Sequence, residues 1–193
     1  MKQNLRIALL MTVVTTILFG LLYHLAVTGL GQLLFPSKAN GGLLVKNGQI
    51  IGSRLIGQPF SSDGYFHGRP SAAGNGYDPV SAGGGASNLG PTNRQLMDRV
   101  KGDIEKLHAE NPGSPVPVDL VTTSGSGLDP DISPAAAEFQ IVRVARARHV
   151  SEAELRSLVA KHTLGRQLGV LGEPRVNVLE LNLDLDAQHP LSK

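Results

Sequence analysis

The chain of 193 residues contains no cysteine and no tryptophan, and aromatic residues make up only 4% of it. Without cysteine it can form neither a disulfide framework nor a thiol-based catalytic centre. The scarcity of aromatic side chains leaves few large apolar anchors. A folded domain of this chain must therefore be held together by ordinary core contacts or by docking on partners.

Charge is missing from one long stretch. No charged residue lies between Arg6 and Lys38, and residues 7–27 are mostly apolar. A helix crosses the hydrocarbon core of a bilayer with about 20 residues, so this run is long enough, and no later run matches it. It is apolar on every face, which does not suit a helix in a soluble core. We predict that residues 1–36 form a membrane anchor, with a transmembrane helix at about residues 7–30.

A cleaved secretory signal is the alternative to an anchor. The apolar run is longer than the roughly 7–15 residues typical of a signal, and the cleavage candidate near residues 26–28 ends in an unfavourable threonine. We therefore favour an uncleaved anchor.

The basic residues predict how the anchor is oriented. Lys2 and Arg6 favour a cytoplasmic N-terminus, although Lys38, Lys46 and Arg54 weaken this bias. We expect residues 37–193 to lie outside the inner membrane, as one exterior (periplasmic) domain.

The composition of this exterior part excludes some functions. All 16 acidic residues follow Lys38, and removing Lys2 and Arg6 from the 18 basic residues leaves 16, so this part is formally neutral before histidine is counted. We therefore expect no nucleic-acid binding. Glycine and proline together make up 35 of the 193 residues, which indicates long, turn-rich connections.

The first half of the exterior part predicts a hairpin, a long loop and a helix. Two short strands flank Asn47-Gly48, a strong hairpin-turn signal, and residues 54–57 are expected to extend the second strand. Residues 58–90 form a loop whose aromatic residues suggest that it is pinned onto something. Thr92 and Gln95 match a capping box that begins a helix ending near Asn111.

The second half predicts alternating strands and helices. We expect an edge strand at residues 116–123 and a helix at 134–147, capped by Ser133. The capping box Ser151-Glu-Ala-Glu begins a helix that runs to about His162, with Gly165 as its C-cap. Residues 176–185 alternate in character and are expected to form a strand. The fold class is α+β: a single N-terminal transmembrane helix followed by one mixed α+β domain.

Glycine- and serine-rich turns do not match catalytic or phosphate-binding loops. A nucleophile elbow requires G-x-S-x-G, but Ser124 stands two residues before Ser126. The run of residues 83–90 lacks the G-K-[ST] of a phosphate-binding loop. We interpret the first as a turn and the second as a flexible surface or interface loop. The D-K-T-G signature of a P-type pump is also missing from the sequence.

Metal-binding patterns are incomplete. Asp129 and Asp131 lie two residues apart, as in calcium loops, but the rest of the twelve-residue pattern is missing. Asp131 is better placed just ahead of the helix that begins after Ser133. The six histidines show no metal-ligand spacing. His24, inside the span, either faces protein or lies near the outer interface, and both interpretations stay open.

Several motifs follow one another along the chain. They are Gly57-Gln-Pro-Phe, Tyr65-Phe-His-Gly-Arg-Pro-Ser, Gly84-Gly-Ala-Ser-Asn-Leu-Gly-Pro, the run from Pro117 to Asp129, Ile132-Ser-Pro, Gln140-Ile-Val-Arg-Val-Ala and Val176-Asn-Val-Leu-Glu-Leu-Asn. In this order they resemble the C subunit of the Kdp potassium-transporting ATPase (the KdpC family), a bacterial inner-membrane complex. The resemblance covers essentially the whole chain. One departure is Asp131, where many members carry histidine or asparagine.

The resemblance implies an accessory subunit rather than a catalyst. Its partners would be a potassium-binding, channel-like subunit, a P-type ATPase subunit and a small membrane peptide, with ATP and K⁺ handled by the complex. The family is also described as a catalytic chaperone that raises the ATP affinity of the pump subunit, and the glutamine matching Gln140 is then assigned a contact with nucleotide. We expect no cofactor bound to this chain alone. The expected partner contacts are Phe60, Tyr65, Phe66, Arg69 and Asn88.

An exterior domain meets no cytoplasmic ATP. An effect on nucleotide affinity would therefore be indirect, through preferred binding to one conformational state of the pump, unless the topology is inverted. A membrane-anchored exterior enzyme or binding protein that acts alone is the alternative function.

Overall fold

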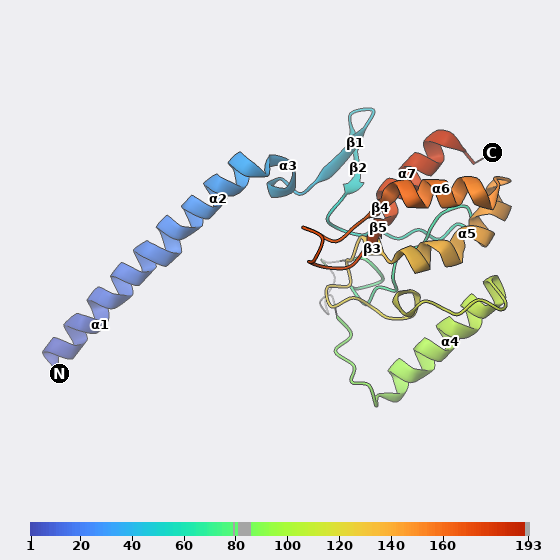
Figure 1. The fold of residues 1–193 in the computed structure, drawn as a ribbon. Coiled ribbons are helices and arrows are strands. Elements are labelled where there is room, and N and C mark those ends of the chain that lie inside the picture. The colour runs from blue at the N-terminus through green and yellow to red at the C-terminus, as the bar shows by residue number, and fades with distance from the viewer. Residues whose placement is uncertain (79, 81–85, 192–193) are drawn as a thin grey trace. The chain divides into compact units, whose positions relative to one another are not determined.

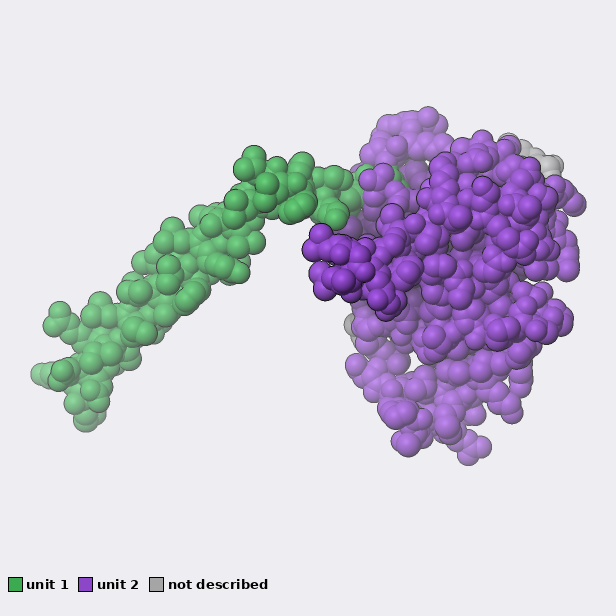
Figure 2. All heavy atoms as spheres, in the orientation of Figure 1, with its two compact units in different colours: residues 1–44 green, residues 45–193 purple. Residues whose placement is uncertain are grey.

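The computed structural model describes residues 1–78, 80 and 86–191. These residues form two compact units, residues 1–44 and residues 45–193 (Figure 2). The α+β fold class is confirmed, since a long apolar N-terminal helix is followed by helices and small antiparallel sheets (Figure 1).

The N-terminal unit is dominated by one continuous helix. It comprises α1 (Lys2–Thr15), a π-helical segment (Thr16–Leu22) and α2 (Tyr23–Leu34). Within the described residues it is the single helix long and apolar enough to cross a membrane. Thr12 and Thr15 donate their hydroxyl hydrogens to backbone carbonyls one turn earlier, so these polar groups are satisfied inside the helix. The short helix α3 (Pro36–Ala39) follows.

The predicted hairpin is confirmed. β1 (Leu43–Lys46) and β2 (Gln49–Ser53) form a two-stranded sheet joined by Asn47 and Gly48. Both turn residues have positive φ, 52° and 78°, as a two-residue hairpin turn of this kind requires. The extension over residues 54–57 is wrong, because β2 ends at Ser53.

The centre of residues 45–193 is a layer of helices on a small sheet (Figure 1). The sheet has the order β3–β5–β4, all antiparallel, and β5 pairs Val176 with both Ile132 and Thr163. α5, α6 and α7 supply most of the core, together with Phe66 from the long loop. The element bounds are β3 (Asp131–Ile132), α5 (Pro134–Arg148), α6 (Glu152–His162), β4 (Thr163–Leu164), β5 (Arg175–Asn177) and α7 (Val178–Gln188).

Local capping signals predicted α5 and α6 correctly. The Ser133 hydroxyl accepts a hydrogen bond from the Ala136 N–H, and Pro134 stands at the first helical position. Ser151 and Glu154 form the reciprocal capping box. Gly165 as the C-cap of α6 is wrong, since the helix ends at His162, Thr163 is its C-cap and the chain enters β4.

The predicted strand at residues 176–185 is wrong beyond Asn177. The Asn177 side chain accepts a hydrogen bond from the Glu180 N–H and begins α7. Val178, Leu181 and Leu185 recur at helical spacing and are buried, so helical periodicity prevails over the apparent alternation.

Two further boundaries need correction. Residues 116–123 do not form a strand. They contain a single 3₁₀ turn, Val118–Leu120, which the prolines before it favour over sheet pairing. α4 (Arg94–Glu110) begins one residue later than predicted, because Asn93 rather than Thr92 accepts the capping bonds, from the N–H groups of Gln95 and Leu96.

Candidate functional site

Asn182 holds the backbone of Phe66. Its Oδ1 accepts a hydrogen bond from the Phe66 N–H at 2.9 Å, and its Nδ2 donates to the Phe66 carbonyl at 2.9 Å. The Asn182 side chain projects from α7 and is 1% exposed, so these bonds form away from water. A carboxamide thus takes the place that a neighbouring strand would occupy.

Gln140 holds the next residue in the same way. Its Oε1 accepts from the His67 N–H at 2.8 Å and its Nε2 donates to the His67 carbonyl at 3.1 Å. Gln140 lies on α5 and is 2% exposed. Its Nε2 also donates to the Ala136 carbonyl, and its Oε1 accepts from Arg143. The carboxamide is therefore engaged on both atoms. We call Gln140, Asn182 and the segment 65–67 between them the carboxamide clamp.

Two arginines of α5 bond the backbone carbonyls of residues 63–65, at the start of this clamp. Arg143 donates to the carbonyls of Asp63 and Tyr65 and pairs with Glu110 at 3.2 Å. Burial lowers the pKa of Arg143, and the charge of Glu110 opposes that shift. With the clamp, Arg143 ties the loop to α5 and to the end of α4.

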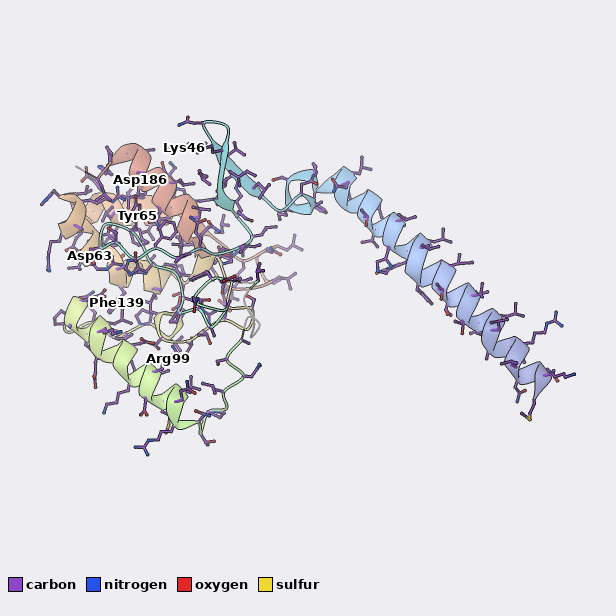
Figure 3. The ribbon with its side chains drawn as sticks, turned by 180° about the vertical axis from the view of Figure 1, so that it is seen from behind. Lys46, Asp63, Tyr65, Arg99, Phe139 and Asp186 are labelled. Atoms are coloured by element: carbon purple, nitrogen blue, oxygen red, sulfur yellow. The ribbon has the colours of Figure 1, made fainter. Side chains whose placement is uncertain are left out.

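Arg148, at the end of α5, also bonds backbone carbonyls, and its side chain is fully buried. It donates to the carbonyls of Gly64 and His189 and pairs with Asp186 at 2.8 Å. Its guanidinium lies over the Tyr65 ring, 4.7 Å from the centroid, a cation–π geometry. The Tyr65 hydroxyl donates to Asp186, and burial together with this carboxylate raises the Tyr65 pKa. Figure 3 shows Tyr65 beside Asp186.

A cavity of about 310 Å³ lies beside the clamp. Its lining comes from the long loop, α4 and α5, and it brings together three of the predicted site residues, Phe60, Arg69 and Gln140. Burial lowers the pKa of His67 in this lining, and the nearby Arg143 charge adds to that effect. Other lining residues are Tyr77, Asp103, Lys106, Leu107 and Glu110.

Arg69 anchors the far side of this cavity. It pairs with Asp129 at 3.0 Å and donates to the carbonyls of Thr122 and Thr123. Its own carbonyl accepts from the Tyr77 hydroxyl at 2.7 Å. Burial, reinforced by the Asp129 charge, raises the pKa of Tyr77 to about 12. Arg69 therefore pins the loop onto residues 122–129 of its own domain, and Tyr77 braces the loop internally.

The predicted contact residues differ in how accessible they are. Phe66 is 0% exposed and belongs to the core, so an interface position for its side chain does not agree with the structure. Phe60 packs against the same core, and its ring lies 5.5 Å from that of Tyr65. Asn88 is exposed and does not line the cavity. Residues 83–85 of the glycine run lie outside the described residues.

Other sequence candidates have structural roles. Asp131 pairs with Arg175 at 3.0 Å and accepts a hydrogen bond from Asn177, while burial raises its pKa. In the long apolar helix, the His24 ring contacts the Phe19 carbonyl through Nδ1 at 2.6 Å. Among the residues that the structure describes, no three histidine or acidic side chains are grouped to hold a metal ion.

Sequence reasoning missed Asn182, Arg143 and Arg148 as residues of this site. Arg143 and Arg148 lie close together on one helix, and the structure shows that both bond backbone carbonyls of the loop. Asn182 was placed in a strand. A polar residue at a core position of a helix was the available signal. It could be recognised only if residues 178–188 were first read with helical periodicity.

These features define a class of protein: a chain with one N-terminal helix suited to crossing a membrane, followed by an α+β domain built around a clamped loop. The model of the family "K+-transporting ATPase, c chain" (KdpC) matches residues 5–187. The chain therefore belongs to the KdpC family.

Curated relatives agree over almost the full length. A potassium-transporting ATPase KdpC subunit of Koribacter versatilis is 62% identical over 191 residues, covering 99% of this chain and 98% of the relative. That of Methylobacterium nodulans is 58% identical and covers 96% and 98%. That of Acidobacterium capsulatum is 57% identical and covers 97% and 100%.

Breaking the carboxamide clamp is expected to destabilise the domain. Gln140→Met removes both bonds to His67, and Asn182→Leu removes both bonds to Phe66. Asn182→Leu leaves the buried N–H and C=O of Phe66 unpaired, and Gln140→Met leaves the partly buried ones of His67. At about 1–3 kcal/mol per group each variant should lose about 2–6 kcal/mol, with Gln140→Met at the lower end. The double variant should lose less than the sum, because both residues hold one segment. Urea unfolding of the full chain in detergent micelles measures these losses.

The exposed Gln95→Met is the matched control and should change stability by less than about 0.5 kcal/mol. Amide hydrogen exchange at Phe66 and His67 should accelerate in both clamp variants. Equal urea midpoints for Gln140→Met and Gln95→Met would contradict the clamp.

The raised pKa of Tyr77 predicts an alkaline loss of stability. The buried neutral phenol favours the folded state fully below the ordinary pKa of 10.0, and this contribution disappears as the pH rises from 10.0 to about 12. Tyr77→Phe should lessen that loss, while costing about 1 kcal/mol at neutral pH for the missing bond to Arg69. Near-ultraviolet titration of tyrosinate, compared between the two proteins, checks the pKa. Ionisation of Tyr77 near its ordinary pKa would contradict the burial.

Proposed function

We propose that this chain is an accessory, non-catalytic subunit of an ATP-driven potassium-uptake complex and that it stabilises the assembly. The carrying observation is the KdpC family match over residues 5–187, together with relatives that are named as subunits of a potassium-transporting ATPase. An apolar helix long enough to span a bilayer is what a subunit of a membrane complex requires.

The proposed partners are a potassium-binding channel-like subunit, a P-type ATPase subunit and a small membrane peptide. The proposed location is the inner membrane, crossed once, with a cytoplasmic N-terminus and residues 37–193 on the exterior side. Lys2 and Arg6 at the start of the helix support this orientation.

For the partner contact we keep Phe60, Tyr65, Arg69 and Asn88 and leave out Phe66. Phe60 and Arg69 line the cavity beside the clamp, and Asn88 is exposed. Tyr65 is half-buried and held by Arg148 and Asp186. Because the clamp orders the loop before any partner arrives, docking would cost little conformational entropy.

A raised ATP affinity of the complex would act through the conformation of the loop. Gln140 is buried and both atoms of its carboxamide are already bonded, which supports a positioning role over direct contact with nucleotide. A subunit that binds one state of a pump more tightly shifts the population towards that state, and nucleotide affinity changes with it.

Co-purification tests the accessory role. The full chain carries an affinity tag and is expressed with a channel-like potassium subunit and a P-type ATPase of the same family of complexes. We expect recovery of a complex with potassium-stimulated ATPase activity. A well-folded chain that recovers neither partner would contradict the proposal and favour a membrane-anchored exterior enzyme or binding protein that acts alone.

Two clamp variants distinguish an indirect from a direct effect on ATP. We expect Gln140→Met and Asn182→Leu to raise the KM for ATP of the assembled complex by similar factors, because both release the same segment. Gln95→Met should leave the KM unchanged. An increase with Gln140→Met but not with Asn182→Leu would instead indicate that Gln140 contacts nucleotide. The measurement is potassium-stimulated ATPase activity against ATP concentration.

A further inference from the structure

The β1–β2 hairpin carries an exposed apolar surface. Leu43, Val45 and Ile50 are 52%, 61% and 64% exposed, although β-branched and aliphatic residues at strand positions are normally covered on one side. We call these three residues the hairpin face. No third strand joins this sheet within the described part of the chain.

The three side chains share one side of the hairpin. Leu43 and Val45 are two residues apart on β1, so they point the same way. The two-residue turn at Asn47 and Gly48 places residue 50 opposite residue 45. Lys46 stands at the turn end of the hairpin, as Figure 3 shows. The hairpin face is therefore apolar, and the side chain of the next residue, Lys46, leaves the other side of β1 beside the turn.

All charged residues among the first 62 residues of the chain are basic. The first acidic residue of the sequence is Asp63, and the 62 residues before it contain five basic residues, Lys2, Arg6, Lys38, Lys46 and Arg54. Arg54 pairs with Glu180 at 2.7 Å, whereas Lys38 and Lys46, which precede and follow Leu43 in the sequence, are exposed. A combination of exposed apolar residues and unopposed lysines is typical of segments that bind anionic bilayer surfaces.

Chain connectivity keeps the hairpin close to the membrane anchor. Leu43 follows Leu34, the last residue of α2, by nine residues, and four of these are in α3. At about 1.5 Å per helical and at most 3.6 Å per extended residue, the hairpin begins within about 25 Å of the end of that helix. It is thus within reach of the headgroup region.

We propose that the hairpin face lies in the interfacial region of a bilayer rich in anionic phospholipid, with Lys38 and Lys46 beside the phosphates. The chain then has two contacts with lipid, the apolar helix and this hairpin. The proposal rests on the helix spanning a membrane, but not on assembly with other subunits.

The absence of cysteine makes the test direct. A nitroxide label on Val45→Cys is the only labelled site in the full chain, which is reconstituted alone into vesicles of phosphatidylcholine with phosphatidylglycerol. Relative accessibility to oxygen and to a water-soluble nickel chelate measures its depth. Ser157→Cys, exposed on α6, is the aqueous control. We expect the label at residue 45 to be protected from nickel and reached by oxygen, in contrast to the control.

Charge and lipid composition provide the second comparison. Lys38→Gln combined with Lys46→Gln, or vesicles of phosphatidylcholine alone, should return the label at residue 45 towards the aqueous values. Ile50→Cys, on the same face, repeats the measurement if Val45→Cys alters the circular dichroism spectrum.

The proposal is overturned if labels at residues 45 and 50 are as accessible to nickel as the control in anionic vesicles. It is also overturned if they become protected only after other subunits are added, which would assign the hairpin face to a protein partner. Failure of lipid contact leaves the co-purification result unaffected, so the two ideas are separable.

Discussion

Two buried carboxamides hold the domain together at its most irregular segment. Gln140 from α5 and Asn182 from α7 each bond both backbone groups of one residue, His67 and Phe66 respectively. Buried backbone groups need partners, and among the residues that the structure describes no strand pairs with this segment to provide them. Because the two residues come from different helices, the loop also links α5 to α7. Phe66 can fill the core only because its backbone has been satisfied in this way.

The charged residues around the clamp follow from the same constraint. Bringing residues 63–65 under the helices buries carbonyls, and Arg143 and Arg148 are long enough to reach them from α5. Each arginine has a carboxylate partner, Glu110 or Asp186, which offsets the cost of burying a guanidinium. Gly68 allows the loop to pass close to Tyr77, where a Cβ would collide with the phenol oxygen. An otherwise irregular loop is thus ordered by side chains far away in sequence.

The features that could be predicted from the sequence are those that depend on residues close together in the chain. The apolar helix, the Asn47-Gly48 hairpin and the caps at Ser133 and Ser151 depend on residues within a few positions of one another. The clamp joins residues that are 73 and 116 positions apart, and no local pattern reports such a distance. Because residues 176–185 were taken for a strand, Asn182 was not recognised as a core residue. Without Asn182, the burial of Phe66 could not be predicted. The long loop was expected to be pinned onto something, and the structure shows it bonded to the domain's own helices α5 and α7. A partner contact through the loop stays a proposal.

The separation between Phe66 and Asn182 also sets an order of events during synthesis. The apolar helix leaves the ribosome first, and the segment that Asn182 will hold follows soon after it. Its partner emerges 116 residues later, which takes about 6–23 s at typical elongation rates. Throughout that interval the backbone groups of Phe66 lack their partner and its side chain lacks the cover of α7. Synthesis of α7 therefore completes the support of this loop, and a chain that stops before Asn182 leaves the Phe66 backbone unpaired.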